Sequence, residues 1–158
     1  NAGDVIADVG SGGGYFTLRF AEMTGLDGWV YAVDTHAGLL AHIGRIAQKQ
    51  GISNVKTLPG DQEGLCLPKE SCDLIFLRNV FHHIDDPESY FAHLRQGLKS
   101  GGRIAILEWC KGAGGHVGRK RHSTPEENIV KIMATAGFVQ KERYDFVKGQ
   151  SFNLFGDS

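Results

Sequence analysis

Short, almost wholly apolar segments alternate with stretches of helical periodicity along most of this chain. The first five apolar segments are residues 5–9, 29–33, 55–58, 73–77 and 103–107. Continuous apolar runs of this length are typical of strands that are buried on both faces. Phe16, Phe20 and Met23 illustrate the stretches between them, because their spacing places them on one face of a helix. Strands that alternate with helices predict a parallel sheet packed between helices.

The ends of the expected helices carry recognisable signals. Asp86-Pro87 predicts a helix start, with Asp86 as N-cap and Pro87 in the first turn. Thr124-Pro125-Glu126-Glu127 predicts a capping box, with Thr124 as N-cap, and Ser100-Gly101-Gly102 predicts a break before the fifth strand. Gly25 and Gly51 are placed to end the first and second helices, and Gly137 is placed to end the helix that Thr124 starts.

The C-terminal part predicts two further strands, residues 138–146 and 151–155. The joint between them is short enough for a hairpin, so the last strand is expected to run antiparallel to its neighbour. We therefore expect one domain over residues 1–158 with a doubly wound α/β fold. Its sheet has seven mostly parallel strands, helices on both faces and an antiparallel C-terminal hairpin strand.

Composition limits the function classes. The 158 residues and 17.2 kDa correspond to one domain, and 17 Lys+Arg against 18 Asp+Glu leave a net charge of −1. This balance argues against a nucleic-acid or membrane-surface binder, and no apolar run reaches the roughly 18 residues of a membrane span. Three cysteines without a C-x-x-C pair indicate neither a disulfide framework nor a zinc site, and they favour a cytoplasmic protein. Cys66, Cys72 and Cys110 are interpreted as small buried hydrophobic residues.

The strongest local motif follows the first strand, where residues 8–14 read D-V-G-S-G-G-G. Glycines let the backbone turn tightly and approach a ligand. The dinucleotide pattern G-x-G-x-x-G is not met, because Tyr15 occupies the third glycine position after Gly10 and Gly12. Asp8 at the end of a buried strand would repel a diphosphate and attract an ammonium group.

A second carboxylate, Asp34, ends the second strand. In nucleotide-binding folds an acid at this place accepts hydrogen bonds from ribose hydroxyls. Asp8 and Asp34 together predict a ligand with a ribose at one end and a positive group at the other.

Five motifs in order resemble the class I S-adenosylmethionine-dependent methyltransferases, type 11, which are Rossmann-like. They are D-V-G-S-G-G-G at 8–14, V-D-T-H-A at 33–37, G-D-Q at 60–62, N-V-F-H-H-I at 79–84 and L-K-S-G-G-R at 98–103. The resemblance implies S-adenosylmethionine as cofactor and S-adenosylhomocysteine as product, with transfer of a methyl group to a small-molecule acceptor.

The resemblance also implies a set of cofactor-binding residues. Asp8 is expected near the ammonium group, the backbone of Gly10, Ser11 and Gly12 against the methionine part, and Asp34 and Thr35 at the ribose. Asp61 is expected to accept a hydrogen bond from the adenine amino group, and Gln62 is expected beside the adenine ring. The main chain of Arg78 and Asn79 is expected at the methionine end. Relatives usually carry cover helices before the first strand, and the domain is expected to lack them.

Two other function classes stay open at this point. A non-catalytic module that binds S-adenosylmethionine would carry the same motifs. A nicotinamide-dependent oxidoreductase would share Asp34, although Tyr15 and Asp8 weigh against it. The acceptor atom and the oligomeric state, a homodimer included, are left open by the sequence.

Other polar residues carry weaker signals. His82 is the candidate to line the acceptor pocket as a base, whereas His83 is interpreted as structural packing. Glu108 at the end of the fifth strand is read either as a substrate contact or as a solvated strand end. No metal site is predicted, since no further ligands accompany the two histidines. The basic stretch 111–122 is read either as a lid that attracts an anionic acceptor or as a solvated loop.

Overall fold

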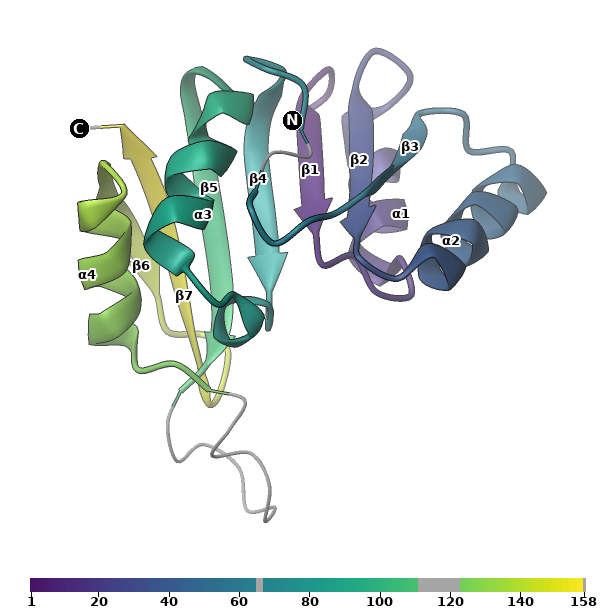
Figure 1. Ribbon diagram of the computed structural model, residues 1–158. Coiled ribbons are helices and arrows are strands. Elements are labelled where there is room, and N and C mark those ends of the chain that lie inside the picture. The colour runs from purple at the N-terminus through teal and green to yellow at the C-terminus, as the bar shows by residue number, and fades with distance from the viewer. Residues whose placement is uncertain (65–66, 111–122, 158) are drawn as a thin grey trace.

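A computed structural model describes residues 1–64, 67–110 and 123–157, and within them one seven-stranded sheet forms the centre of the fold (Figure 1). The strand order is β3-β2-β1-β4-β5-β7-β6. The strands are β1 (Val5–Val9), β2 (Trp29–Asp34), β3 (Val55–Pro59), β4 (Cys72–Arg78), β5 (Leu98–Trp109), β6 (Phe138–Tyr144) and β7 (Gln150–Asp157). The seven-stranded α/β prediction is thereby confirmed.

The direction of the strands also follows the prediction. β1 pairs in parallel with β2 and β4, whereas β7 pairs antiparallel with both β5 and β6. The chain proceeds from β1 to one side through β2 and β3, and then returns to the other side of β1 with β4. This reversal opens a crevice beyond the carboxyl ends of β1 and β4, which is where open α/β sheets bind ligands.

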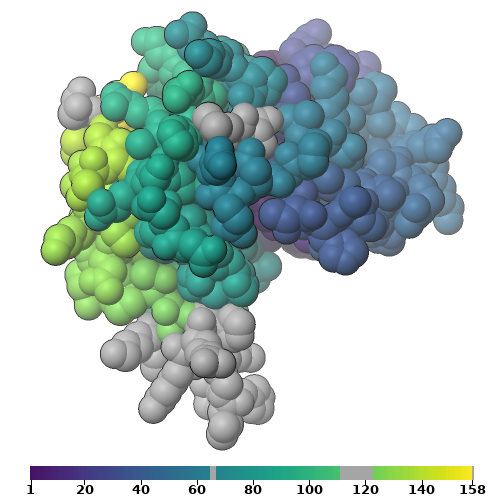
Figure 2. Space-filling model, viewed as in Figure 1, coloured from purple at the N-terminus to yellow at the C-terminus, as the bar shows by residue number. Residues whose placement is uncertain are grey.

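Helices cover both faces of the sheet. They are α1 (Tyr15–Thr24), α2 (Ala37–Gln50), α3 (Pro87–Leu94) and α4 (Glu126–Thr135), with short 3-10 turns η1 (Phe81–His83) and η2 (Arg95–Gly97). In Figure 1, α3 and α4 lie in front of the sheet and α1 lies behind it. Figure 2, seen from the same side, shows the side chains of α3 and α4 joined in one surface over that half of the sheet. Among the described residues, no helix combines the length and the apolar character needed to cross a bilayer.

The main core lies between the sheet and the pair α3 and α4. Phe91 and Leu94 of α3 and Ile129 and Met133 of α4 are fully buried there. Asp86 caps α3 as predicted, because its Oδ1 accepts a hydrogen bond from the Ser89 N–H at 3.2 Å. A smaller cluster on the opposite face packs Phe16 and Phe20 of α1 toward the sheet.

Two sequence expectations are wrong in detail. The helix α4 begins at Glu126 after Pro125 with ψ 137° and has no side-chain cap, so Thr124 lies one residue too far out to cap it. The Ser100-Gly101-Gly102 segment does not precede the fifth strand but belongs to it, with Gly101 at φ 75° beside an irregularity in the pairing with β4. Cys72 is buried and Cys110 half-buried, while Cys66 and the 111–122 stretch lie outside the described residues.

Candidate active site

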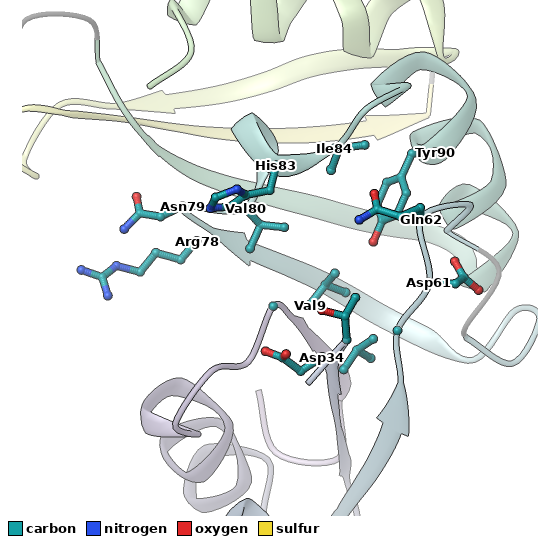
Figure 3. A pocket seen from close by; sticks show the side chains of 14 residues that line it. Val9, Asp34, Asp61, Gln62, Arg78, Asn79, Val80, His83, Ile84 and Tyr90 are labelled. Atoms are coloured by element: carbon teal, nitrogen blue, oxygen red, sulfur yellow. The ribbon is translucent and has the colours of Figure 1, made fainter. Parts of the chain in front are cut away.

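A cavity of about 300 Å³ lies at the carboxyl ends of the strands on both sides of the chain reversal. Its walls come from the ends of β1, β2 and β4, the turn after β3, and the segment from η1 into α3 (Figure 3). Among the predicted site residues, seven line it: Gly10, Asp34, Thr35, Asp61, Gln62, Arg78 and Asn79. In Figure 3, Asp61, Gln62 and Tyr90 lie toward one end of the cavity, and Arg78 and Asn79 lie toward the other.

The glycine turn after β1 is held by hydrogen bonds from its own N–H groups. The N–H groups of Gly10 and Ser11 both donate to the Val33 carbonyl oxygen, at 2.8 and 3.0 Å. The Gly12 N–H donates to Asp34 Oδ2 at 2.9 Å. A diphosphate is normally bound by free N–H groups of such a turn. Because these N–H groups are already used within the protein, the turn does not form a diphosphate cradle.

Gly10 brings this turn into very close contact with the segment after β4. It has φ 72°, and a Cβ at this position would lie 2.2 Å from Cγ2 of Val80. Only glycine therefore fits here, and its absent side chain lets β1 and the β4 turn form one continuous cavity wall.

Asp34 connects the glycine turn to the cavity. Besides the bond from Gly12, its Oδ1 accepts from the His36 N–H at 2.8 Å, and the residue is half-buried on the cavity wall. Each carboxylate oxygen offers two acceptor sites. The carboxylate is thus fixed by two backbone donors and still has acceptor capacity for ligand hydroxyls.

Asp61 is oriented by the turn that follows β3. Its Oδ1 accepts from the N–H groups of Glu63 and Gly64, at 2.9 and 2.6 Å. This geometry holds the carboxylate and the adjoining Gln62 at one end of the cavity. The pair supplies acceptors, and Gln62 also supplies amide donors, as the edge of a purine base requires.

Asn79 sets the turn at the end of β4. It adopts φ 56°, its N–H donates to the Leu107 carbonyl oxygen at 2.8 Å, and its Oδ1 accepts from Gln150 Nε2 at 2.7 Å. Arg78 reaches away from the cavity, with its guanidinium 5.3 Å from the ring centroid of Phe16 (Figure 3). Both residues therefore contribute mainly backbone to the cavity wall.

Asp8, Ser11 and Gly12 do not line the cavity. Asp8 is only 3% exposed, and its Oδ2 accepts from Thr17 Oγ1 at 2.6 Å. Burial raises the pKa of Asp8 from 3.8 to about 6, and hydrogen bonds from Thr17 offset part of this effect. The structure gives this carboxyl a protein partner, and its predicted contact with an ammonium group stays a prediction.

The placement expected for the two histidines is reversed. His83 is exposed and lines the cavity, whereas the His82 side chain is 6% exposed and does not. His82 Nδ1 lies 3.0 Å from Glu108 Oε1. Glu108 is 0% exposed, so it is neither a solvated strand end nor a part of the cavity wall.

Sequence reasoning also missed the apolar part of the cavity wall. It consists of Val9, Val33, Val80, Ile84 and Tyr90. These residues look like ordinary core residues in the sequence, and only their place at the strand ends distinguishes them. Within the described ranges, no three His, Cys, Asp or Glu side chains gather as a metal site would require.

Comparison with known proteins finds matches over most of this chain. Residues 7–106 match the family model described as "Methyltransferase domain". Over 112 residues the chain is 30% identical to a protein of Marinomonas sp. (strain MWYL1) named ubiquinone/menaquinone biosynthesis C-methyltransferase UbiE. That match covers 70% of this chain and 44% of the relative, so the chain spans less than half of the relative's length.

Solved structures show the same fold. A SAM-dependent methyltransferase from Aquifex aeolicus superimposes with a TM-score of 0.89 at 24% identity, covering 98% of this chain and 82% of that one. The [4+2]-cyclase SpnF superimposes with a TM-score of 0.80 at 21% identity, covering 92% and 54%. At these identities the likeness concerns the fold, and these two proteins show that one fold carries different activities.

Proposed function

Because this chain belongs to the family of methyltransferase domains, we propose that it transfers the methyl group of S-adenosylmethionine to a small-molecule acceptor. The observation that carries the proposal is the glycine turn, whose N–H groups are bound by Val33 and Asp34. A site built in this way presents carboxylates to its ligand. It suits a nucleoside that carries hydroxyl donors and a positive charge, and it does not suit a dinucleotide.

The residues of the cavity fit the parts of this cofactor. Asp34 would accept from the ribose hydroxyls, with Thr35 beside it, and Asp61 with Gln62 would bind the adenine edge. The main chain of Gly10, Arg78 and Asn79 would hold the amino-acid end, and Ser11 and Gly12 would support that end through the glycine turn. When bound, the cofactor supplies a methyl group on a sulfonium that is already reactive.

Positioning is the main contribution that we assign to the chain itself. The apolar walls formed by Val9, Val80 and Ile84 would exclude water from the reacting groups. Holding two reactants in a fixed orientation removes much of the entropic barrier to their reaction. The relative's name specifies C-methylation in quinone biosynthesis, so a hydroxylated aromatic compound is the first acceptor class that we propose to test.

Calorimetry with S-adenosylhomocysteine tests the cofactor site. The Asp34→Ala variant should bind at least about 100-fold more weakly, since hydrogen bonds to a charged group contribute about 1.5–3 kcal/mol each. Asp27→Ala, which changes an exposed aspartate in the turn before β2, should bind like the parent protein. Binding of NADH without binding of S-adenosylhomocysteine would contradict the proposal.

A second assay separates an enzyme from a binding module. The protein is incubated with methyl-labelled S-adenosylmethionine and a panel of acceptors that includes 1,4-naphthoquinol, and methylated products are sought by mass spectrometry. Product formation supports the methyltransferase. Tight cofactor binding without any product favours the non-catalytic module.

A further inference from the structure

The turn η1 between β4 and α3 is anchored in the core by two consecutive side chains. Phe81 is buried and stacks on Phe91 of α3, with ring centroids 5.2 Å apart. His82 points toward the end of β5, where its Nδ1 lies 3.0 Å from Oε1 of Glu108. With Phe81 and His82 fixed in different directions, the third residue of the turn, His83, is left on the cavity side.

The partner of His82 is unusual for its burial. Glu108 is 0% exposed, and its Oε1 also accepts from the Trp109 N–H at 2.8 Å. Its Oε2 has no hydrogen-bond partner among the described residues. A buried carboxylate is costly, and it persists where its partners are held in good geometry. This cost is difficult to explain if the pair merely fills space in the core.

His83 stands where a methyl acceptor would approach. Its ring centroid lies 4.1 Å from that of His82. Figure 3 shows His83 above Val80 and next to Asn79, at the end of the cavity opposite to Asp61 and Gln62. On the proposed function, this is the end that holds the methionine part and the methyl group.

We propose that His83 takes a proton from the methyl acceptor, and that His82 and Glu108 are positioning residues that hold His83 for this step. The inference rests on the proposed function. For a quinol, the hydroxyl proton passes to the imidazole of His83, and the neighbouring ring carbon forms the bond to the methyl carbon as the carbon–sulfur bond breaks. The electron pair of that bond stays on sulfur. The ring carbon then loses its hydrogen as a proton while the oxygen becomes a hydroxyl again, so that one proton is released per methyl transferred.

The charged and titratable groups that share the cavity with His83 come from several elements. They are Asp34 at the end of β2, Asp61 after β3, Arg78 at the end of β4 and Tyr90 in α3, whereas Glu108 of β5 is linked to His83 only through His82. Glu108 is in hydrogen-bond contact with His82 and does not line the cavity. A change at Glu108 therefore reaches His83 through His82 and leaves the carboxylates of the cavity unchanged.

The first experiment needs no acceptor. Long-range proton–nitrogen NMR of the protein labelled with ¹⁵N-histidine reports the tautomer of each imidazole. We expect saturating S-adenosylhomocysteine to shift the His83 signals. We also expect His82 to carry a proton on Nδ1 facing Glu108, and Glu108→Ala to change the signals of both rings. His83 signals that respond neither to the ligand nor to Glu108→Ala would overturn the proposal.

The second experiment measures methyl transfer to 1,4-naphthoquinol. His83→Gln should lower kcat by about 100-fold or more, which is the usual contribution of a general base, and should leave the affinity for S-adenosylhomocysteine within about threefold. The deficit should shrink at alkaline pH, where the quinol hydroxyl ionises without assistance. A merely structural role of His83 would give a deficit that does not depend on pH, and this result would refute the assignment.

Conservative rescue tests the positioning residues. Glu108→Ala should lower kcat about tenfold or more with an unchanged affinity for S-adenosylhomocysteine, whereas Glu108→Gln keeps an acceptor for His82 and should restore most of it. Glu88→Ala, at an exposed site in α3, should have no effect. Equal activity of Glu108→Ala and the parent would refute the role of Glu108. A parent protein that does not bind S-adenosylhomocysteine would instead refute the proposed function.

Discussion

The buried Asp8 carboxyl predicts a measurable dependence of stability on pH. Its pKa is about 6 in the folded chain against 3.8 for a free side chain, chiefly because the carboxyl is buried. The difference of about two units corresponds to about 3 kcal/mol, at 1.36 kcal/mol per unit. A raised pKa means that the protonated form is favoured in the fold. The stabilisation that the protonated Asp8 carboxyl gives to the fold is fully present below pH 3.8, and it is lost as the pH rises through about 6.

The Asp8→Asn variant isolates this effect, because an amide cannot ionise and can still accept the hydrogen bond from Thr17. The free energy of unfolding of the variant minus that of the parent should rise by up to about 3 kcal/mol as the pH rises from 4 to 8. Urea denaturation followed by tryptophan fluorescence at several pH values measures the difference. Any cost of burying the amide is the same at every pH, so it shifts the variant's curve by a constant amount and leaves the predicted change of the difference with pH intact.

Asp73 provides the matched control. Burial alone would raise its pKa, but hydrogen bonds from Lys99 and from the Val5 N–H, with the charge of Lys99, bring the net value below the usual one. Asp73→Asn should therefore lose stability above pH 4, by less than about 1 kcal/mol for this half-buried pair. Parallel pH curves of Asp8→Asn and the parent would refute the reasoning about Asp8.

The remaining predictions concern packing and the cofactor. Gly10→Ala should unfold at a lower temperature and lose S-adenosylhomocysteine binding, because its Cβ would lie 2.2 Å from Val80 Cγ2; calorimetry on Gly13→Ala, where nothing lies within 4 Å, is the comparison. Phe91→Ala should cost about 3–5 kcal/mol in a denaturant titration, since the ring is fully buried between α3 and the sheet. If the ammonium group of S-adenosylhomocysteine contacts Asp8, binding near pH 6 should release a proton from the parent protein and none from Asp8→Asn. Calorimetry in buffers of different ionisation enthalpy measures this release.

Much of the fold was readable because the central strands β1, β2, β4 and β5 contain nearly continuous apolar runs. A parallel strand between two layers of helices is buried on both faces, so nearly all of its residues are apolar. The polar residues that follow the carboxyl ends of such strands then identify the crevice. This is why Asp34 and Asp61 were placed correctly on the cavity wall. The start of α4 was misplaced because the capping pattern does not reveal that Pro125 keeps an extended ψ.

The two histidines show where sequence patterns stop being informative. His82 and His83 are adjacent and chemically identical, and only the direction of a 3-10 turn decides which of them enters the core. That direction depends on Phe81 and on Asn79 with φ 56°, neither of which signals it in the sequence. The burial of Glu108 was missed for the same reason, since its partner comes from a different strand end.

The position of β7 has a consequence for how the protein is made. This last strand inserts between β5 and β6 and pairs with both. On the ribosome, the ladder edge of β5 stays open while the roughly 40 residues that separate the two strands are synthesised, which takes about 2–8 s at 5–20 residues per second. An open apolar edge is a template for misassembly. Nascent chains stalled before β7 should therefore be the form of this protein that most needs chaperones.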